Sequence, residues 1–350
     1  MINLLCISSD LDIITYNMLG SLKSKGYNIY ITYSTKNEHQ KIEEIGCMGV
    51  KIFPLKGKLN IKNILLINKI IKKYQIQINY CLTSTGIANA TIASTFRKIK
   101  TIAYRGTQAK IRPTDPTYYL GILNPKLNTV ICETPDIKAQ LNKYLSKKNL
   151  IVNPKPYKTD WVKNAILNPK ELSGTPKNAF VVICIAKTKG RPHKGLSELI
   201  KGVHLLKNKT IHLLHIGDYD KSNYELAKQG NNANQIHFAG FKHDAIHYLP
   251  KSDVCICPST RDAAPLAIKE AMACGKPTIV TDIPGARDLV VHQKTGLIIP
   301  PNSPEAIAKA IEYLASQPHK TEAFGKAAKE HLEKTFCMKN YLEKFDLVFK

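Results

Sequence analysis

The sequence has no run approaching eighteen apolar residues, has one tryptophan, and has few acidic residues, 27 against 51 lysines and arginines. The lack of a long apolar run excludes a membrane-spanning helix. The nine cysteines occur singly, mostly inside apolar runs, and no C-x-x-C pair is present. This usage argues against a zinc site or a disulfide framework and is typical of reduced cysteines in a cytoplasmic protein.

The positive charge is concentrated in one part of the chain. Of the formal net charge of +24, most comes from residues 51–160, which hold 20 lysines and arginines but four acids. This concentration predicts an anionic partner or surface. Aromatic residues make up 7% of the chain and no base-stacking motif is present. A basic nucleic-acid-binding protein is therefore an alternative with little support, and we expect no nucleic-acid partner.

A basic amphipathic helix is predicted within this region. Lysines alternate there with isoleucines and leucines over residues 56–73. A helix of this kind is suited to an anionic membrane surface. An ordinary core-facing helix with a solvated lysine face is the alternative. The lysines are Lys56, Lys58, Lys62, Lys69, Lys72 and Lys73.

Short apolar, β-rich runs alternate with longer helical patterns in both halves of the chain. This alternation predicts an α/β protein with a parallel, doubly wound sheet in each half. The polar loop at residues 8–12, after the first predicted strand, lacks the glycines that would let the backbone approach a phosphate. The predicted strands are 2–8, 28–33, 50–53, 79–82, 101–104 and 128–132, then 179–186, 211–216 and 236–239.

The length of 350 residues predicts two domains. Residues 153–176 hold four prolines and a glycine directly before a new apolar strand, and this is the best candidate for the boundary. We therefore expect an N-terminal domain over 1–160 and a C-terminal domain over 161–335. The amphipathic segment 336–350 predicts a terminal helix.

A cationic loop follows the first strand of the second half. Residues 187–195 read KTKGRPHKG, with five cationic or titratable side chains in a glycine- and proline-containing loop. A loop at the carboxyl end of a strand in an α/β fold is where ligands bind. The composition therefore predicts an anion site, with a merely solvated loop as the alternative.

Residues 252–300 predict a strand, a loop, a helix and a second strand. The helix begins near Pro265, because proline is tolerated in a first turn, where its missing N–H costs nothing. The start of a helix after a buried strand presents free N–H groups and positive dipole to an anion. Asp262 stands at the helix start, and Glu270 lies about two turns further along near the same face.

Three motifs in this stretch carry a resemblance to a known family. The pattern P-S-x-x-[acid], then seven residues, then E-A-M-A-C-G-K-P begins at Pro258, and G-x-x-[acid]-L-V and T-G-x-x-x-P follow at Gly285 and Thr295. Together they resemble the donor-site signature of family 4 retaining glycosyltransferases (glycosyl transferases group 1). The resemblance implies the GT-B fold, with two Rossmann-like doubly wound domains facing across a cleft. It also implies a C-terminal helix that crosses back to the N-terminal domain.

The resemblance assigns roles to residues of the second half. Lys194 and Arg191 match the lysine and arginine that hold the donor diphosphate, with Lys187 and Lys189 as alternatives to Arg191. Glu270 is implied to bind the ribose hydroxyls, and Asp262, where the family usually has the longer Glu, to contact the sugar. The other implied donor-binding positions are Gly217, Gly240 and Phe241 near the base and Ala263, Ala264, Pro265 and Leu266 at the helix start.

Arg105 is the candidate site residue of the first half. It lies at a predicted strand end, in the sequence Tyr104-Arg105-Gly106-Thr107, and stands near the position where the family often has His. Arginine can bind a phosphate or an anionic acceptor through two parallel hydrogen bonds, but it cannot serve as a general base. The alternative is an arginine that only fixes the turn.

The resemblance implies a retaining glycosyltransferase. It would move a sugar from a nucleotide diphosphate sugar to a hydroxyl of a cell-envelope saccharide, of lipopolysaccharide or capsule type. We expect no cofactor and no metal, with cationic side chains stabilising the leaving group. We expect a cytoplasmic location, peripheral on the inner membrane where the acceptor is met. A nucleotide-sugar epimerase of the same fold is the alternative enzyme.

Overall fold

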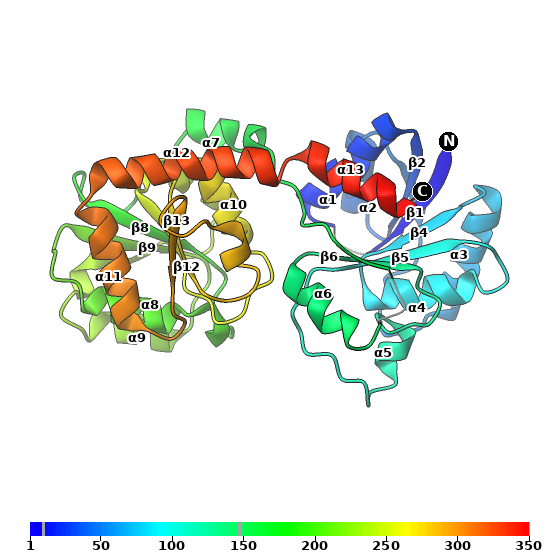
Figure 1. The fold of residues 1–350 in the computed structure, drawn as a ribbon, viewed down its shortest axis with the longest axis horizontal. Coiled ribbons are helices and arrows are strands. Elements are labelled where there is room, and N and C mark those ends of the chain that lie inside the picture. The colour runs from blue at the N-terminus through cyan, green and yellow to red at the C-terminus, as the bar shows by residue number, and fades with distance from the viewer. Residues whose placement is uncertain (9–10, 146–148, 350) are drawn as a thin grey trace. The chain divides into compact units, whose positions relative to one another are not determined.

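The computed structural model describes residues 1–8, 11–145 and 149–349, and these form two compact units. The N-terminal unit comprises Met1–Pro156 together with Met338–Lys350, and the C-terminal unit comprises Tyr157–Cys337. Each unit is built on a parallel sheet with helices packed on it (Figure 1). The polar loop predicted over residues 8–12 lies partly outside the described residues.

The sheet of the N-terminal unit has strand order β3-β2-β1-β4-β5-β6-β7. Strand order therefore reverses between β1 and β4, which pair in parallel from Leu4 with Ile78 to Ile7 with Cys81. Its strands are β1 (Ile2–Ile7), β2 (Tyr27–Tyr33), β3 (Met48–Lys51), β4 (Ile78–Cys81), β5 (Lys100–Arg105), β6 (Thr129–Cys132) and β7 (Asn149–Val152). Its helices are α1 (Ile13–Leu22), α2 (Lys36–Glu44), α3 (Ile61–Lys73), α4 (Ser84–Ala93), α5 (Thr117–Leu120), α6 (Pro135–Asn142) and α13 (Met338–Phe349).

The sheet of the C-terminal unit has strand order β10-β9-β8-β11-β12-β13, with the reversal between β8 and β11. Apolar side chains on one face of it pack against helices α8 and α11 around Leu199 and Ile311, which are fully buried. Its strands are β8 (Phe180–Ile185), β9 (Ile211–Ile216), β10 (Ile236–Phe238), β11 (Val254–Cys257), β12 (Thr278–Thr281) and β13 (Gly296–Ile299). Its helices are α7 (Lys163–Leu167), α8 (Leu196–His204), α9 (Lys221–Lys228), α10 (Leu266–Ala273), α11 (Pro304–Ala315) and α12 (Pro318–Thr335).

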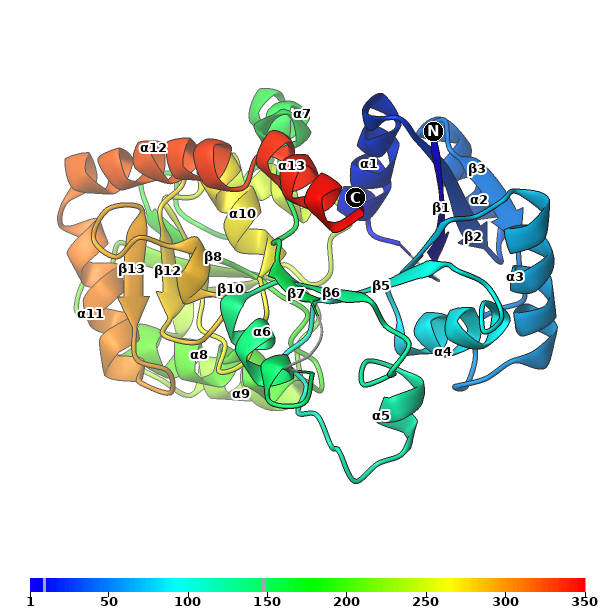
Figure 2. The same ribbon diagram turned by 45° about the vertical axis from the view of Figure 1, so that its right-hand side comes forward.

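The terminal helix α13 belongs to the N-terminal unit and lies beside α1 in both views (Figures 1 and 2). Phe345 is fully buried and meets the ring of Tyr80 edge-on, with the centroids 5.2 Å apart. The hydroxyl of Tyr27 donates to Asp346 at 2.8 Å. The prediction of a C-terminal helix that returns to the N-terminal domain is therefore confirmed, as is that of two Rossmann-like sheets.

Helix α3 is the basic amphipathic helix of the sequence. Its buried residues, among them Ile67, Ile70 and Ile71, face the core, so the core-facing interpretation holds for this side. The exposed side keeps lysines and also Ile61 and Leu65, which are 75% and 60% exposed. Among the described residues, no helix is long and apolar enough to cross a bilayer.

Candidate active site

A cavity of about 400 Å³ lies at the carboxyl edge of the C-terminal sheet. It is lined by residues that follow β8, among them Lys187, and by Pro258 and Ser259, which follow β11. These two strands are neighbours at the point where the strand order reverses. Parallel α/β sheets bind ligands in the crevice at such a point, because the loops on its two sides diverge to opposite faces.

Glycine at position 195 lets the cationic loop pack directly on the end of β11. Gly195 has a φ of +72°, and a Cβ atom there would lie 2.0 Å from the carbonyl oxygen of Pro258. The loop is also held by the carbonyl oxygen of Asp218, which accepts from the N–H groups of Thr188 at 2.8 Å and Lys189 at 3.0 Å. The backbone of this loop is thus fixed before any ligand binds.

Three of the four predicted cations of this loop line the cavity. They are Lys187, Arg191 and Lys194, whereas Lys189 is exposed and is not among the lining residues. The Nζ atom of Lys194 donates to Oδ2 of Asp262 at 2.6 Å, and both side chains are largely buried. The Nζ atom of Lys187 lies 4.9 Å from the ring centroid of Phe241. The cavity therefore combines several cations with the Asp262 carboxylate, which is paired with Lys194.

Helix α10 begins at the cavity, one residue later than the sequence suggested. Pro265 is the N-cap rather than a first-turn residue, and no side chain caps the helix. The next two residues, Leu266 and Ala267, line the cavity. First-turn N–H groups have no partner within a helix and carry the positive end of its dipole. This helix start adds a second source of positive potential to the cations of the loop.

Glu270 lies one turn further along α10 and also lines the cavity. Burial raises the pKa of its carboxyl group to about 7. The cause is the loss of solvation of the charged form. A carboxylate in this position accepts hydrogen bonds from a ligand's hydroxyl groups well, because such bonds replace the lost water.

The opposite wall of the cavity is formed by residues after β9 and β10. Gly217 has a φ of +143°, and a Cβ there would lie 1.9 Å from the carbonyl oxygen of Ala186, so only glycine fits. Its N–H donates to the carbonyl oxygen of Gly240 at 2.9 Å. Phe241 and Lys242 line the cavity beyond this bond. Of the residues predicted here and at the start of α10, Gly240 and Ala263 are not among the lining residues, whereas Asp262, Ala264, Pro265 and Leu266 are.

Arg105 lies in the N-terminal unit, at the end of β5, and not in this cavity. It lines a separate cavity of about 310 Å³ with Tyr104, Gly106 and Thr107. Lys242 and Ser259 also line the first cavity but were not assigned a role from the sequence, although Ser259 belongs to the P-S-x-x-[acid] motif and Lys242 directly follows Phe241. Their position in the cavity becomes apparent once the strand order is known. Lys242 follows β10 and Ser259 follows β11, and both strands end at the same edge of the sheet.

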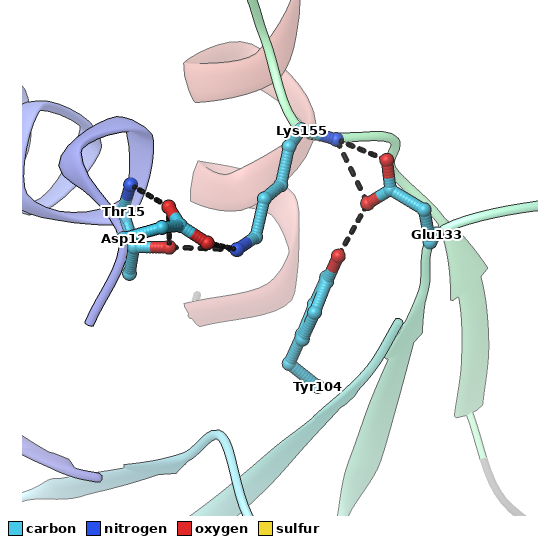
Figure 3. Close-up of polar contacts among 5 residues, drawn as sticks. All are labelled: Asp12, Thr15, Tyr104, Glu133 and Lys155. Carbon is cyan, nitrogen blue, oxygen red and sulfur yellow. Dashed lines mark hydrogen bonds and ion pairs between the residues drawn. The ribbon is translucent and has the colours of Figure 1, made fainter. Parts of the chain in front are cut away.

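A polar network at the carboxyl edge of the N-terminal sheet was not predicted from the sequence (Figure 3). The backbone N–H of Lys155 donates to both carboxylate oxygens of Glu133, at 3.2 and 3.0 Å, and the Tyr104 hydroxyl also bonds to Glu133. The Lys155 Nζ atom donates to Oδ2 of Asp12 at 2.6 Å and to the Thr15 hydroxyl at 2.8 Å. Burial opposes ionisation of Asp12, but Lys155 and hydrogen bonds from Thr15 outweigh it and lower the pKa. The network holds the residues just before the unit boundary onto this sheet.

Comparison with curated proteins relates the C-terminal unit to sugar transferases. Residues 170–331 match the family model described as glycosyl transferases group 1. The lipopolysaccharide core biosynthesis glycosyltransferase LpsD of Rhizobium meliloti is 25% identical over 265 residues, covering 73% of this chain and 72% of that protein. The N,N'-diacetylbacillosaminyl-diphospho-undecaprenol alpha-1,3-N-acetylgalactosaminyltransferase of Campylobacter jejuni is 26% identical over 45% of this chain. That match spans 43% of the relative, less than half of its length.

Comparison with solved structures covers the whole chain. A glycosyltransferase from Rickettsia africae has a TM-score of 0.86 at 21% identity, over 100% of this chain and 98% of that chain. Anabaena Alr3699/HepE, solved in complex with UDP and glucose, has a TM-score of 0.79 at 15% identity, over 99% of both chains. Residues 170–331, with the cavity at β8, β11 and α10, therefore belong to the glycosyl transferases group 1 family, and the chain has the GT-B fold.

Proposed function

We propose that this protein is a retaining glycosyltransferase that uses a UDP-sugar and transfers the sugar to a hydroxyl group of a cell-envelope saccharide. The observation that carries the proposal is the cavity of the C-terminal unit. Arg191, Lys194 and the uncapped start of α10 meet there at the point of strand-order reversal. Cations and a helix N-terminus together suit a diphosphate. UDP is favoured because the structurally similar Anabaena protein was solved with UDP and with UDP-glucose.

The donor would lie across the cavity with its diphosphate at α10 and the cationic loop. Glu270 accepts hydrogen bonds from the ribose hydroxyls, and Gly217 with Phe241 borders the base. The bond between the anomeric carbon and the diphosphate oxygen then breaks as the acceptor oxygen attacks from the same face. The acceptor proton passes to the departing diphosphate oxygen. Lys194 and Arg191 stabilise the negative charge that develops on the leaving group.

In this proposal the charge on the leaving group is neutralised by the protein and not by a metal ion. Lys187, Arg191 and Lys194 line the cavity with two carboxylates, Asp262 and Glu270. The Asp262 carboxylate is already paired with Lys194. The charged side chains of the cavity together therefore favour an anionic ligand over a metal ion. Activity that is unchanged by EDTA would support this part, and activity that requires added Mg²⁺ or Mn²⁺ would contradict it.

We propose a cell-envelope acceptor because several relatives act in envelope biosynthesis. They include LpsD and the capsular polysaccharide biosynthesis glycosyltransferase CapM of Staphylococcus aureus. We further propose that the N-terminal unit binds the acceptor at the inner face of the membrane. A surface of α3 and the end of α4, here called the α3–α4 patch, supports this part. It consists of Ile61, Leu65, Ile92 and Phe96, which are all exposed, and the neighbouring Lys62, Lys69 and Arg97.

The α3–α4 patch has the composition of a surface that inserts into an anionic bilayer. Phe96 is 99% exposed, and it borders a groove of about 330 Å³ that Leu65, Ile92 and Arg97 also line. Exposed apolar side chains rimmed by cations bind lipid through both buried area and attraction to anionic headgroups. The patch thus supports a membrane-binding role for one side of α3, while the other side packs in the core.

The donor site is tested by thermal shift of the full chain with UDP, GDP, ADP and CMP. We expect UDP to raise the melting temperature of the wild type and to have little effect on Lys194→Ala, because the stabilisation by a ligand grows with the ratio of its concentration to its dissociation constant. Stabilisation by none of the nucleotides would contradict the proposal. A panel of UDP-sugars with envelope saccharides then gives the product, and NMR gives its anomeric configuration. A changed sugar nucleotide formed without acceptor would indicate an epimerase instead.

A further inference from the structure

Arg105 is a buried cation with few polar partners among the described residues. It is the last residue of β5 and is 8% exposed. Its Nη2 atom donates to the carbonyl oxygen of Ala109 at 2.6 Å. Its Nε atom is buried without a hydrogen-bond partner, and no carboxylate among the described residues forms an ion pair with the guanidinium. A buried charge without a counter-charge is costly, so such an arrangement is retained where a ligand supplies the missing charge.

The unpaired guanidinium borders a cavity that other features also make favourable for an anion. The cavity, of about 310 Å³, lies beside the strand-order reversal of the N-terminal sheet, with Leu82 after β4 and Arg105 and Gly106 at the end of β5. Ser84, the first residue of α4, lines it as well. Helix α4 has ten residues, so the positive end of its dipole points to this region. Hydroxyl groups of Ser84 and Thr107 add hydrogen-bond donors.

We propose that the Arg105 cavity binds an oxyanion, a phosphate or a carboxylate, that belongs to the sugar acceptor. This proposal rests on the glycosyltransferase function proposed above. The acceptor is the expected source because the cavity of the C-terminal unit has its own cations for the donor diphosphate, Arg191 and Lys194. A guanidinium group binds either oxyanion through two parallel hydrogen bonds, and that of Arg105 borders the cavity without a carboxylate partner among the described residues.

The test uses inorganic phosphate as the probe and the full chain with saturating UDP, so that the donor cavity is filled. Sodium chloride keeps the ionic strength constant. We expect phosphate to raise the melting temperature of the wild type by several degrees at concentrations well above its dissociation constant. Arg105→Met should show no rise. Arg112→Gln, which removes an exposed arginine of the following loop, should respond as the wild type does.

Folding of the variants is checked in phosphate-free buffer. Arg105→Met should melt at or above the wild-type temperature, because it replaces an unpaired buried charge with an apolar side chain. If that variant does not fold, Arg105→Lys is used. It keeps the charge but loses the planar set of donors, and it should weaken phosphate binding about tenfold or more. Acetate in place of phosphate distinguishes a carboxylate-type site from a phosphate-type site.

Three outcomes would overturn the proposal. They are the absence of a phosphate effect on UDP-saturated wild type, an undiminished effect in Arg105→Met, and a tenfold loss of UDP affinity in Arg105→Met. The last would assign the guanidinium to the donor diphosphate. If UDP itself does not bind, the proposed function fails separately. Phosphate binding at Arg105 is then measured without UDP, by comparing Arg105→Met with Lys194→Ala.

Discussion

The Nζ atom of Lys194 lies 2.6 Å from Oδ2 of Asp262, and both residues line the cavity of the C-terminal unit. The lysine comes from the loop after β8 and the carboxylate from the loop after β11, so the pair joins the two sides of the strand-order reversal. Without a donor, the pair neutralises both charges in a partly buried site. A bound diphosphate would compete with Asp262 for the ammonium group and leave the carboxylate free to contact the sugar.

Replacing Lys194 with alanine is expected to lower turnover on the order of a hundredfold or more, since in the proposed mechanism the ammonium stabilises charge that develops on the leaving diphosphate. The measurement is release of UDP from the UDP-sugar that the wild type uses. Lys189→Ala is the matched control, because Lys189 is an exposed lysine of the same loop outside the cavity. Equal rates for the wild type and Lys194→Ala would exclude this role.

Glu270 predicts a pH dependence of UDP binding. Burial raises the pKa of its carboxyl group to about 7, so below that pH the group is protonated in the free protein. If the carboxylate accepts hydrogen bonds from the ribose, UDP affinity should rise from pH 6 to pH 8, with a loss of about tenfold per unit below the pKa. Calorimetric titration measures this profile.

Glu270→Gln separates this effect from ionisation of UDP itself, whose terminal phosphate titrates near pH 6. The variant should bind UDP more weakly than the wild type at pH 8, and its UDP affinity should change less between pH 6 and pH 8. The same substitution changes stability, because a carboxyl group with a raised pKa in the folded state favours folding below its ordinary value of 4.5, and this contribution is lost as pH rises through 7. If UDP affinity depended on pH in the same way in the wild type and in Glu270→Gln, the assignment of Glu270 to the ribose would be contradicted.

His215 predicts a loss of stability in acid. The ring is fully buried against Tyr219 and Phe238, and burial lowers its pKa to about 4, from an ordinary 6.5. Below pH 6.5 the unfolded chain therefore binds the proton more readily than the folded one, and stability falls until about pH 4. The loss is on the order of 3 kcal/mol.

Urea unfolding of the wild type and of His215→Phe at pH 7.5 and pH 4.5 measures the contribution of His215 to the loss of stability in acid. The variant cannot bind the proton, so it should lose less stability between the two conditions. His319→Gln removes an exposed histidine and serves as the control. A pH effect in His215→Phe as large as in the wild type would place the acid sensitivity elsewhere.

The α3–α4 patch predicts binding to anionic membranes. Phe96→Ser and Leu65→Ser together should lower partitioning to phosphatidylglycerol vesicles at low salt by about tenfold or more, since each removes apolar area that is proposed to enter the bilayer. Co-sedimentation at several salt concentrations is the measurement. Leu347→Ser is the matched control, because Leu347 is also exposed and lies on α13, outside the patch. Wild-type protein that stays in solution with these vesicles would refute the membrane part.

The sequence predicted the parallel α/β sheets and several of the residues that line the C-terminal cavity, because those signals are local. The loop with Lys194 and the helix with Glu270 lie within short, continuous stretches next to strands. Close approaches between distant segments were not predictable. That Gly195 must be glycine depends on the carbonyl oxygen of Pro258, which is 63 residues away in the chain. Only the strand order reveals this contact.

The network of Asp12, Glu133 and Lys155 escaped prediction for the same reason. Each residue follows a different strand of the N-terminal sheet, and in the sequence each resembles an ordinary surface charge. The lack of an ion pair to the Arg105 guanidinium among the described residues could not be predicted either, because it depends on which side chains the fold places around this group. Strand β7 was missed because it has four residues and lies directly before the proline-rich boundary segment.

The position of α13 makes the C-terminal unit an insertion within the N-terminal one. The N-terminal unit is completed by Met338–Lys350, so a fragment that stops at Pro156 lacks Phe345 and exposes the ring of Tyr80 that it covers. Neither simple truncation nor end-to-end fusion therefore yields a complete N-terminal half. A chimaera that takes its C-terminal unit from a relative would replace the segment 157–337 between two junctions and keep the native tail.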